Sequence, residues 1–178
     1  MFSPARVSWR EWLGLGAGLL GLGTLFLPWT RLRATDPEVG AALAELPADE
    51  VSRSAWDSTF FAWFPPLLLL LAGLAVTLAG QSAKARVSGL PQLWLVACAV
   101  ALVSLVLGWL IIDWQFGSEQ RALLRAGGVT VNAGIGRYLG LAAALASTVA
   151  AVLDVRAARA EARHPRKGTP GGRRRPVS

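Results

Sequence analysis

The sequence predicts an all-α integral membrane protein, a four-helix bundle with both termini on the cytoplasmic side, and three observations support this. The chain has 178 residues, of which 53% are hydrophobic and 16% charged, and its mean hydropathy is +0.45. This is too apolar for an ordinary soluble domain. Four long apolar stretches alternate with polar segments. The Lys and Arg residues gather in alternate polar segments, which is typical of multi-pass membrane proteins.

The first apolar stretch covers residues 13–29 and is flanked by Trp12 and Trp29, residues that favour the membrane interface. A helix over this range rises about 26 Å at ~1.5 Å per residue, close to the ~30 Å hydrocarbon core of a bilayer. A cleaved signal peptide is the alternative. The candidate cleavage site after this stretch, at residues 32–34, lacks the small residue expected three positions before the cut. We therefore expect an uncleaved first span.

The second span is expected at residues 60–79. Its first third is aromatic and is followed by Pro65 and Pro66 and then by a run of leucines. Two prolines remove two backbone donors and disfavour helix in the preceding residue. Either a helix kinks there, or the aromatic segment lies in the interface and the span begins at Pro65.

The third and fourth spans are expected at residues 93–112 and 135–153. The third carries no charged residue, and the fourth opens near Arg137 and closes before Asp154. No charged residue lies in the interior of the four ranges, because Arg137 stands at the opening of the fourth. Because ion-coupled carriers ordinarily place an ionisable group near mid-membrane, this pattern disfavours a transporter.

The charge distribution predicts the orientation. The N-terminal segment, the central loop and the C-terminal tail together hold twelve Lys and Arg and three acidic residues. The other two loops, counted with Arg137 at the opening of the fourth span, hold six Lys and Arg and eight acidic residues. Cytoplasmic segments of membrane proteins keep the positive charges. Both termini should therefore be cytoplasmic, with residues 30–59 and 113–134 outside.

Each outer loop is expected to carry a short interfacial helix. Asp36 can cap a helix with Pro37 in its first position, which predicts a helix over residues 37–46. Residues 118–125, ended by two glycines, predict a second one. Residues 129–131 have the composition of a short strand.

Small residues recur at helical spacing in three of the spans. Such residues let helix backbones approach closely within lipid, where van der Waals contact drives association. We expect them to pack the four helices against one another, with a partner-binding face as the alternative. They are Gly14, Gly18, Gly21, Ala97, Ala101, Ser104, Gly108, Gly136, Gly140 and Ala144.

The chain is expected to end in a basic, partly disordered cytoplasmic tail over residues 156–178. Its cations would attract anionic lipid head groups at roughly 1 kcal/mol each. A nucleic-acid site is not expected, because no aromatic stacking residue accompanies the charges. The basic residues are Arg156, Arg159, Arg163, Arg166, Lys167, Arg173, Arg174 and Arg175.

Catalysis and metal binding find little support in the residue pattern. The single Cys98 lies in an apolar run, and the single His164 lies in the tail, away from the carboxylates of the outer loops. We therefore expect no enzyme activity, no metal and no cofactor. If the outer face acts chemically, the best candidates are Trp56, Asp57 and Asp113.

In the order of its spans, loops and short motifs, the chain resembles small four-helix membrane proteins of actinobacteria, whose functions are mostly unassigned. The resemblance rests on Trp29, Ser54-Ala55-Trp56, the leucine-rich second span, Arg125-Ala126-Gly127 and residues 136–143, and covers most of residues 12–153. The Pro65-Pro66 pair departs from that pattern. The resemblance implies the topology and a location in the cell membrane, and it implies no catalytic residue.

These observations favour a non-enzymatic subunit or scaffold of a bacterial cell-envelope complex, with a protein partner or a second copy in the membrane. A small transporter or oligomeric channel is the alternative, and it needs a polar path. A membrane-embedded enzyme acting on lipid or envelope precursors is a third hypothesis, which would depend on the outer carboxylates.

Overall fold

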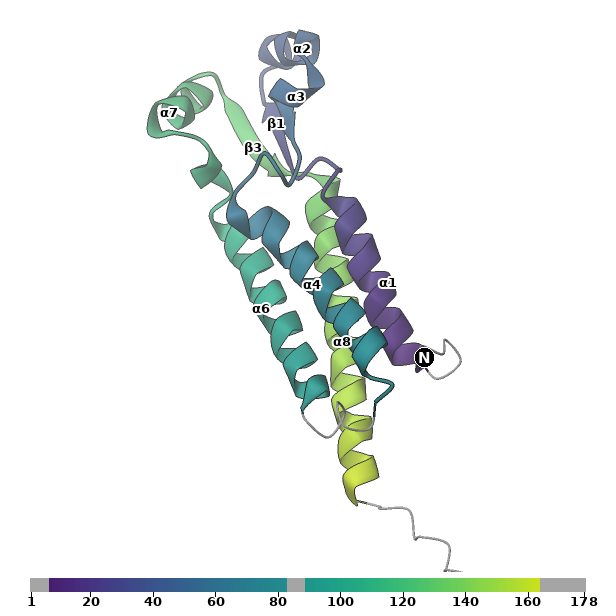
Figure 1. Ribbon diagram of the computed structural model, residues 1–178. Helices are drawn as coiled ribbons and strands as arrows, with labels where there is room; N and C mark the ends of the chain where they lie inside the picture. The colour runs from purple at the N-terminus through teal and green to yellow at the C-terminus, as the bar shows by residue number, and fades with distance from the viewer. Residues whose placement is uncertain (1–6, 83–88, 164–178) are drawn as a thin grey trace, which may run out of the picture.

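The computed structural model describes residues 7–82 and 89–163. Over these residues, long helices lie side by side in a bundle, and a smaller crown of strands and short helices stands on one end of it (Figure 1). The start of α1 and the end of α8 lie at the opposite end of the bundle (Figure 1). The long helices are α1 (Trp9–Thr24), α4 (Phe60–Ala79), α6 (Leu90–Leu110) and α8 (Ile135–Arg163).

Three of these helices, α4, α6 and α8, are long and apolar enough to cross a membrane. The fourth, α1, has 16 residues, which corresponds to about 24 Å of helix. It begins and ends earlier than the predicted span at residues 13–29. Ser8 caps it: the Ser8 Oγ accepts from the backbone N–H of Glu11 at 3.3 Å, and the Ser8 N–H donates to the Glu11 carboxylate at 2.7 Å.

The four helices form a closed ring, in which α1 and α6 each pack against both α4 and α8. Small and medium side chains fill the centre, and the indole of Trp94 crosses from α6 toward α1, where it occupies the space beside Gly14. The buried core includes Leu25, Leu69, Val76, Trp94, Cys98, Ala101, Leu105, Ala144, Ala150 and Ala151.

Helix α4 continues through the proline pair. It starts at Phe60, and both prolines are buried inside it. Pro65 lacks the N–H that would bond to the carbonyl of Phe61. Gly108 of α6 lies against this turn, and a Cβ added to it would lie 3.2 Å from that carbonyl oxygen. The missing side chain lets α6 approach the disturbed turn closely.

The protein is mostly helical, but it is not all-α as expected, because the crown contains strands. The crown contains a three-stranded antiparallel sheet in the order β2-β1-β3, in which the two loops predicted to lie outside pair with each other. Thr30 pairs with Arg53 on one side and with Ala133 on the other. The strands are β1 (Thr30–Ala34), β2 (Ser52–Arg53) and β3 (Val129–Ala133), and the short helices are α2 (Pro37–Glu45), α3 (Ala48–Val51), η2 (Ile112–Gln115) and α7 (Ser118–Ala126).

Candidate functional site

The crown, defined here as residues 30–53 and 112–133, is attached to the bundle through Trp29. The Trp29 N–H donates to the carbonyl of Arg53 at 2.8 Å, and its carbonyl accepts from the N–H of Gly134 at 2.9 Å. Its indole is 1% exposed and lies against Gly136 and Gly140 of α8. Trp29 was expected at the membrane interface, but it is buried because these two glycines leave room for its ring.

Arg137 reinforces the same junction. Its Nε donates to the carbonyl of Trp29 at 2.9 Å and its Nη1 to the carbonyl of Gly108 at 2.7 Å. The guanidinium is buried, and its Cζ lies 5.9 Å from the centre of the Trp29 ring. Gly108 lies in the last turn of α6, where carbonyls lack helical partners and carry partial negative charge. One side chain therefore joins the end of α6, the entry to β1 and the start of α8.

Sequence reasoning noted Arg137 only as the start of the last span. Its position two residues into an apolar helix was the available signal, since a charged residue inside such a helix ordinarily has a specific partner. The partners of Arg137 are backbone carbonyls. Every residue has a carbonyl, so the sequence does not indicate which ones the guanidinium would bind.

The predicted small residues lie at the helix contacts within this one chain. A Cβ on Gly18 would lie 2.8 Å from the Cα of Leu70, and a Cβ on Gly21 would lie 3.6 Å from the Cα of Pro66. Ala97 is half-buried, and the other nine are buried: Gly14, Gly18, Gly21, Ala101, Ser104, Gly108, Gly136, Gly140 and Ala144.

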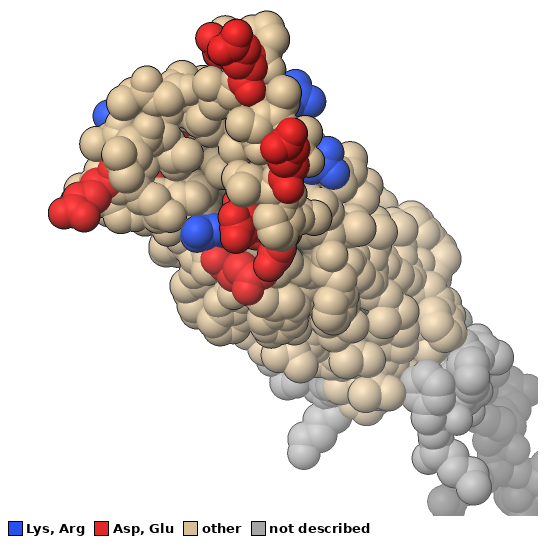
Figure 2. Space-filling view, turned by 90° about the horizontal axis from the view of Figure 1, so that it is seen from above, with Lys and Arg blue, Asp and Glu red and all other residues tan. Residues whose placement is uncertain are grey.

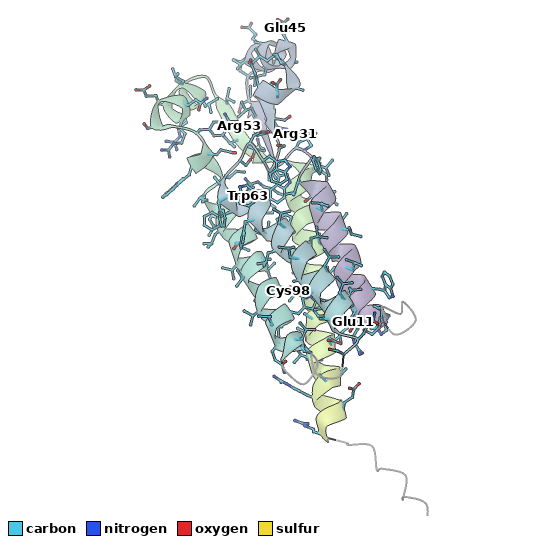
Figure 3. The ribbon with its side chains drawn as sticks, in the orientation of Figure 1. Glu11, Arg31, Glu45, Arg53, Trp63 and Cys98 are labelled. Carbon is cyan, nitrogen blue, oxygen red and sulfur yellow. The ribbon has the colours of Figure 1, made fainter. Side chains whose placement is uncertain are left out.

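Charged residues also cluster at the opposite end of the bundle. Arg10 of α1 forms an ion pair with Asp154 of α8, with Nε and Oδ1 3.3 Å apart. Glu11, expected outside the first span, lies in the first turn of α1, is 1% exposed, and places its carboxylate beside Gly80 (Figure 3). The spacing Ser8-x-x-Glu11, a capping box, was the overlooked signal.

Part of the predicted lipid-binding tail belongs to α8. Arg156, Arg159 and Arg163 are exposed on its last turns and line a shallow groove of about 320 Å³. The remaining predicted cations lie outside the described residues: Arg166, Lys167, Arg173, Arg174 and Arg175.

The predicted outer-face residues lie on separate elements. Asp57 precedes α4 and accepts a hydrogen bond from the Ser54 hydroxyl at 2.6 Å. Asp113 lies in η2, at a hollow of about 210 Å³ that it shares with Arg121 and Arg125 of α7. Among the described residues, no group of three His, Cys, Asp or Glu could hold a metal ion. Ser58, next to Asp57, donates to the side-chain oxygen of Gln115 in η2 at 3.1 Å, so the two segments adjoin, but no hydrogen bond joins the two carboxylates within the described residues.

Trp56 belongs to a cluster of aromatic side chains with Phe60, Trp63 and Phe64. Trp63 lies on α4 where the bundle meets the crown (Figure 3). The ring of Trp56 stacks on Trp63 with centroids 6.3 Å apart, and Phe60 stacks on Phe64 at 4.6 Å. Trp56 and Phe60 are each about half exposed. Exposed aromatic rings of this kind favour the boundary between lipid and water.

The carboxylates of the crown are all exposed, and Figure 2 shows acidic side chains gathered on this face. The ion pair of Arg10 and Asp154 at the other end is the one salt bridge found in residues 7–82 and 89–163, so none of these carboxylates is neutralised by a salt bridge within the described chain. The carboxylates are Asp36, Glu38, Glu45, Asp49, Glu50, Asp113 and Glu119, and Asp57, just outside the crown, is exposed as well.

The crown is thus a folded, acidic surface that is fixed to the end of an apolar bundle. No protein-family model, curated protein or solved structure matches the chain. A function for it therefore rests on the geometry of its own residues.

Proposed function

We propose that this protein is a non-enzymatic subunit or scaffold of a bacterial cell-envelope complex, with its crown outside and both termini in the cytoplasm. The observation that carries the proposal is the crown itself, whose carboxylates are exposed while Trp29 and Arg137 fix it to the bundle. A rigid charged surface suits the docking of a partner with a basic face, because little conformational entropy is lost on binding.

The charge distribution supports the orientation. The crown is acidic, whereas the opposite end carries Arg10 and the arginines of α8. Membrane proteins retain their basic segments in the cytoplasm. The crown would then face the outside of the cell membrane.

The polar groups of the bundle support a scaffold over a transporter. The hydroxyls of Thr24, Thr77 and Thr148 donate to carbonyls of their own helices. Cys98 and Ser147 contact each other at 3.2 Å between α6 and α8. These groups are engaged within the bundle, whereas a transport path needs polar groups that face an aqueous route.

The test is purification from native membranes in a mild detergent after cross-linking, followed by mass spectrometry of proteins recovered at stoichiometric yield. We expect a defined partner. Substituting Glu45, Asp49 and Glu50 of the crown by lysine should abolish its recovery. Glu161→Lys, an exposed acid at the opposite end, is the matched control and should leave recovery unchanged.

A monomer without partners would contradict the proposal, as would a partner whose recovery is insensitive to the crown substitutions. In that case, solute flux into liposomes containing the purified protein would test the transporter hypothesis.

A further inference from the structure

A groove runs along β1 beneath α2 in the crown. It consists of two adjoining cavities of about 420 and 280 Å³ that share lining from β1, α2 and α3. Its apolar wall is formed by Leu32, Leu43, Leu46 and Val51. None of the carboxylates of the crown is among the residues that line it.

Two arginines of β1 border this groove. Arg31 and Arg33 are two residues apart, so their side chains leave the same face of the strand, and both are exposed. Neither side chain has an ion pair or a hydrogen bond within the part of the chain that the structure describes. Two adjacent guanidinium groups without a protein partner are suited to an anion with several oxygen atoms, such as a phosphate.

The apolar wall is incompletely covered by the protein. No residue of α2 is buried, Leu43 is half-buried and Leu46 is 44% exposed. Apolar side chains that border a groove gain free energy when an apolar molecule covers them. The leucines of α2 in this wall stand farther from the bundle than Arg31 (Figure 1), so the two arginines are the part of the groove nearest the bundle.

The position of the groove favours a membrane lipid. Arg31 is the second residue of β1 and lies at the base of the crown, beside the end of the bundle (Figure 3). At about 3.3 Å per residue, Arg31 and Arg33 lie within roughly 10 Å of the start of the strand. The head-group layer of one leaflet is about 5–7 Å thick. Measured from Thr30, Arg31 at about 3 Å falls within a layer of that depth and Arg33 at about 10 Å lies just above it. A lipid phosphate can therefore reach Arg31 directly and Arg33 through its long side chain, while the acyl chains remain near the bundle.

We propose that Arg31 and Arg33, at the border of the groove nearest the bundle, bind the phosphate of a phospholipid with an anionic head group, whose acyl chains lie beside the bundle. This lipid site needs no protein partner. It goes beyond the docking role of the crown and shares with it only the position of the crown at the membrane surface.

The test uses the full-length protein in nanodiscs of phosphatidylcholine with a tenth of phosphatidylglycerol, and native mass spectrometry to count the lipids retained. We expect phosphatidylglycerol to be enriched over its share of the nanodisc. The double variant R31Q/R33Q should lower its affinity roughly thirtyfold, the effect of two lipid-contacting cations. The basic tail contributes equally in every variant.

The matched control is R121Q/R125Q, which removes two arginines from α7 at the other hollow of the crown. It should leave the enrichment unchanged. Leu43→Gln, on the apolar wall away from the bundle, should also leave the enrichment unchanged. Thermal unfolding of each variant reports whether it folds, and since Arg31 and Arg33 are exposed we expect no shift.

Three results would overturn the proposal: no enrichment of phosphatidylglycerol, equal losses in both double variants, or displacement of the lipid by glycerol phosphate alone. The last would identify a site for soluble anions. Since none of these measurements involves a protein partner, they fail or succeed separately from the cross-linking experiment.

Discussion

The guanidinium of Arg137 lies over the indole of Trp29 and also donates a hydrogen bond to the carbonyl of the same residue, at 2.9 Å. Trp29 precedes the first strand of the crown, and Arg137 begins the last helix of the bundle. A displacement of the crown would therefore disturb the packing of α8. This contact couples the crown to the helical bundle.

Replacing Arg137 by methionine should destabilise the protein by about 3 kcal/mol, because two buried carbonyls each lose a charge-assisted hydrogen bond. Arg137→Lys should have an intermediate effect, since a single ammonium group cannot match the two-sided contact of the guanidinium. Denaturant unfolding in detergent, followed by tryptophan fluorescence, measures this. Arg125→Met, at an exposed arginine of α7, is the control and should change stability by less than about 0.5 kcal/mol. Equal midpoints for both methionine variants would contradict the proposed junction.

Gly18→Ala should destabilise the bundle by about 1–3 kcal/mol, because the added methyl group would overpack a fixed contact. Its Cβ would lie 2.8 Å from the Cα of Leu70, which is backbone of α4 and cannot rotate away. Gly16→Ala in the same helix meets nothing within 4 Å and should be neutral or stabilising by up to ~1 kcal/mol. Thermal unfolding of the two variants compares them directly. Equal destabilisation would show that helix α1, rather than its contact with α4, responds to alanine.

The helices of the bundle were the most predictable part of the fold, because lipid-exposed helices need long apolar stretches and these are visible in composition. The range of α4 matches its prediction. The range of α1 does not, because the capping box at Ser8 starts this helix before the apolar stretch begins and the chain leaves the helix after Thr24.

The sheet of the crown was the least predictable part, because it joins segments about 100 residues apart. Residues 129–131 showed strand composition, but β1 alternates arginine with Leu32 and Ala34 and its partner could not be read from either loop alone. The groove at Arg31 and Arg33 was missed for the same reason. It exists only because α2 folds back over β1.

Cys98 should not react with maleimide in the folded protein. Its side chain is completely buried between helices and lies 3.2 Å from the hydroxyl of Ser147. Thiol reagents need access to the sulfur, so labelling should require denaturant and should follow the unfolding curve. Gly18→Ala should shift labelling to lower denaturant, whereas Gly16→Ala should not. Rapid labelling of the native protein with its fluorescence unchanged would show that the core at Cys98 is open.

The orientation can be tested with one cysteine on each side of the bundle. In a Cys98→Ala background, Ala41→Cys places an exposed thiol on α2 of the crown, and Ala160→Cys places one on the last turns of α8. A maleimide that cannot cross membranes should label residue 41 on intact cells and residue 160 only after the cells are permeabilised, because basic segments stay in the cytoplasm. Both positions are exposed alanines on helices, so each serves as the control for the other. The reverse labelling pattern would place the acidic crown in the cytoplasm and would remove the basis for an outer-leaflet lipid at Arg31 and Arg33.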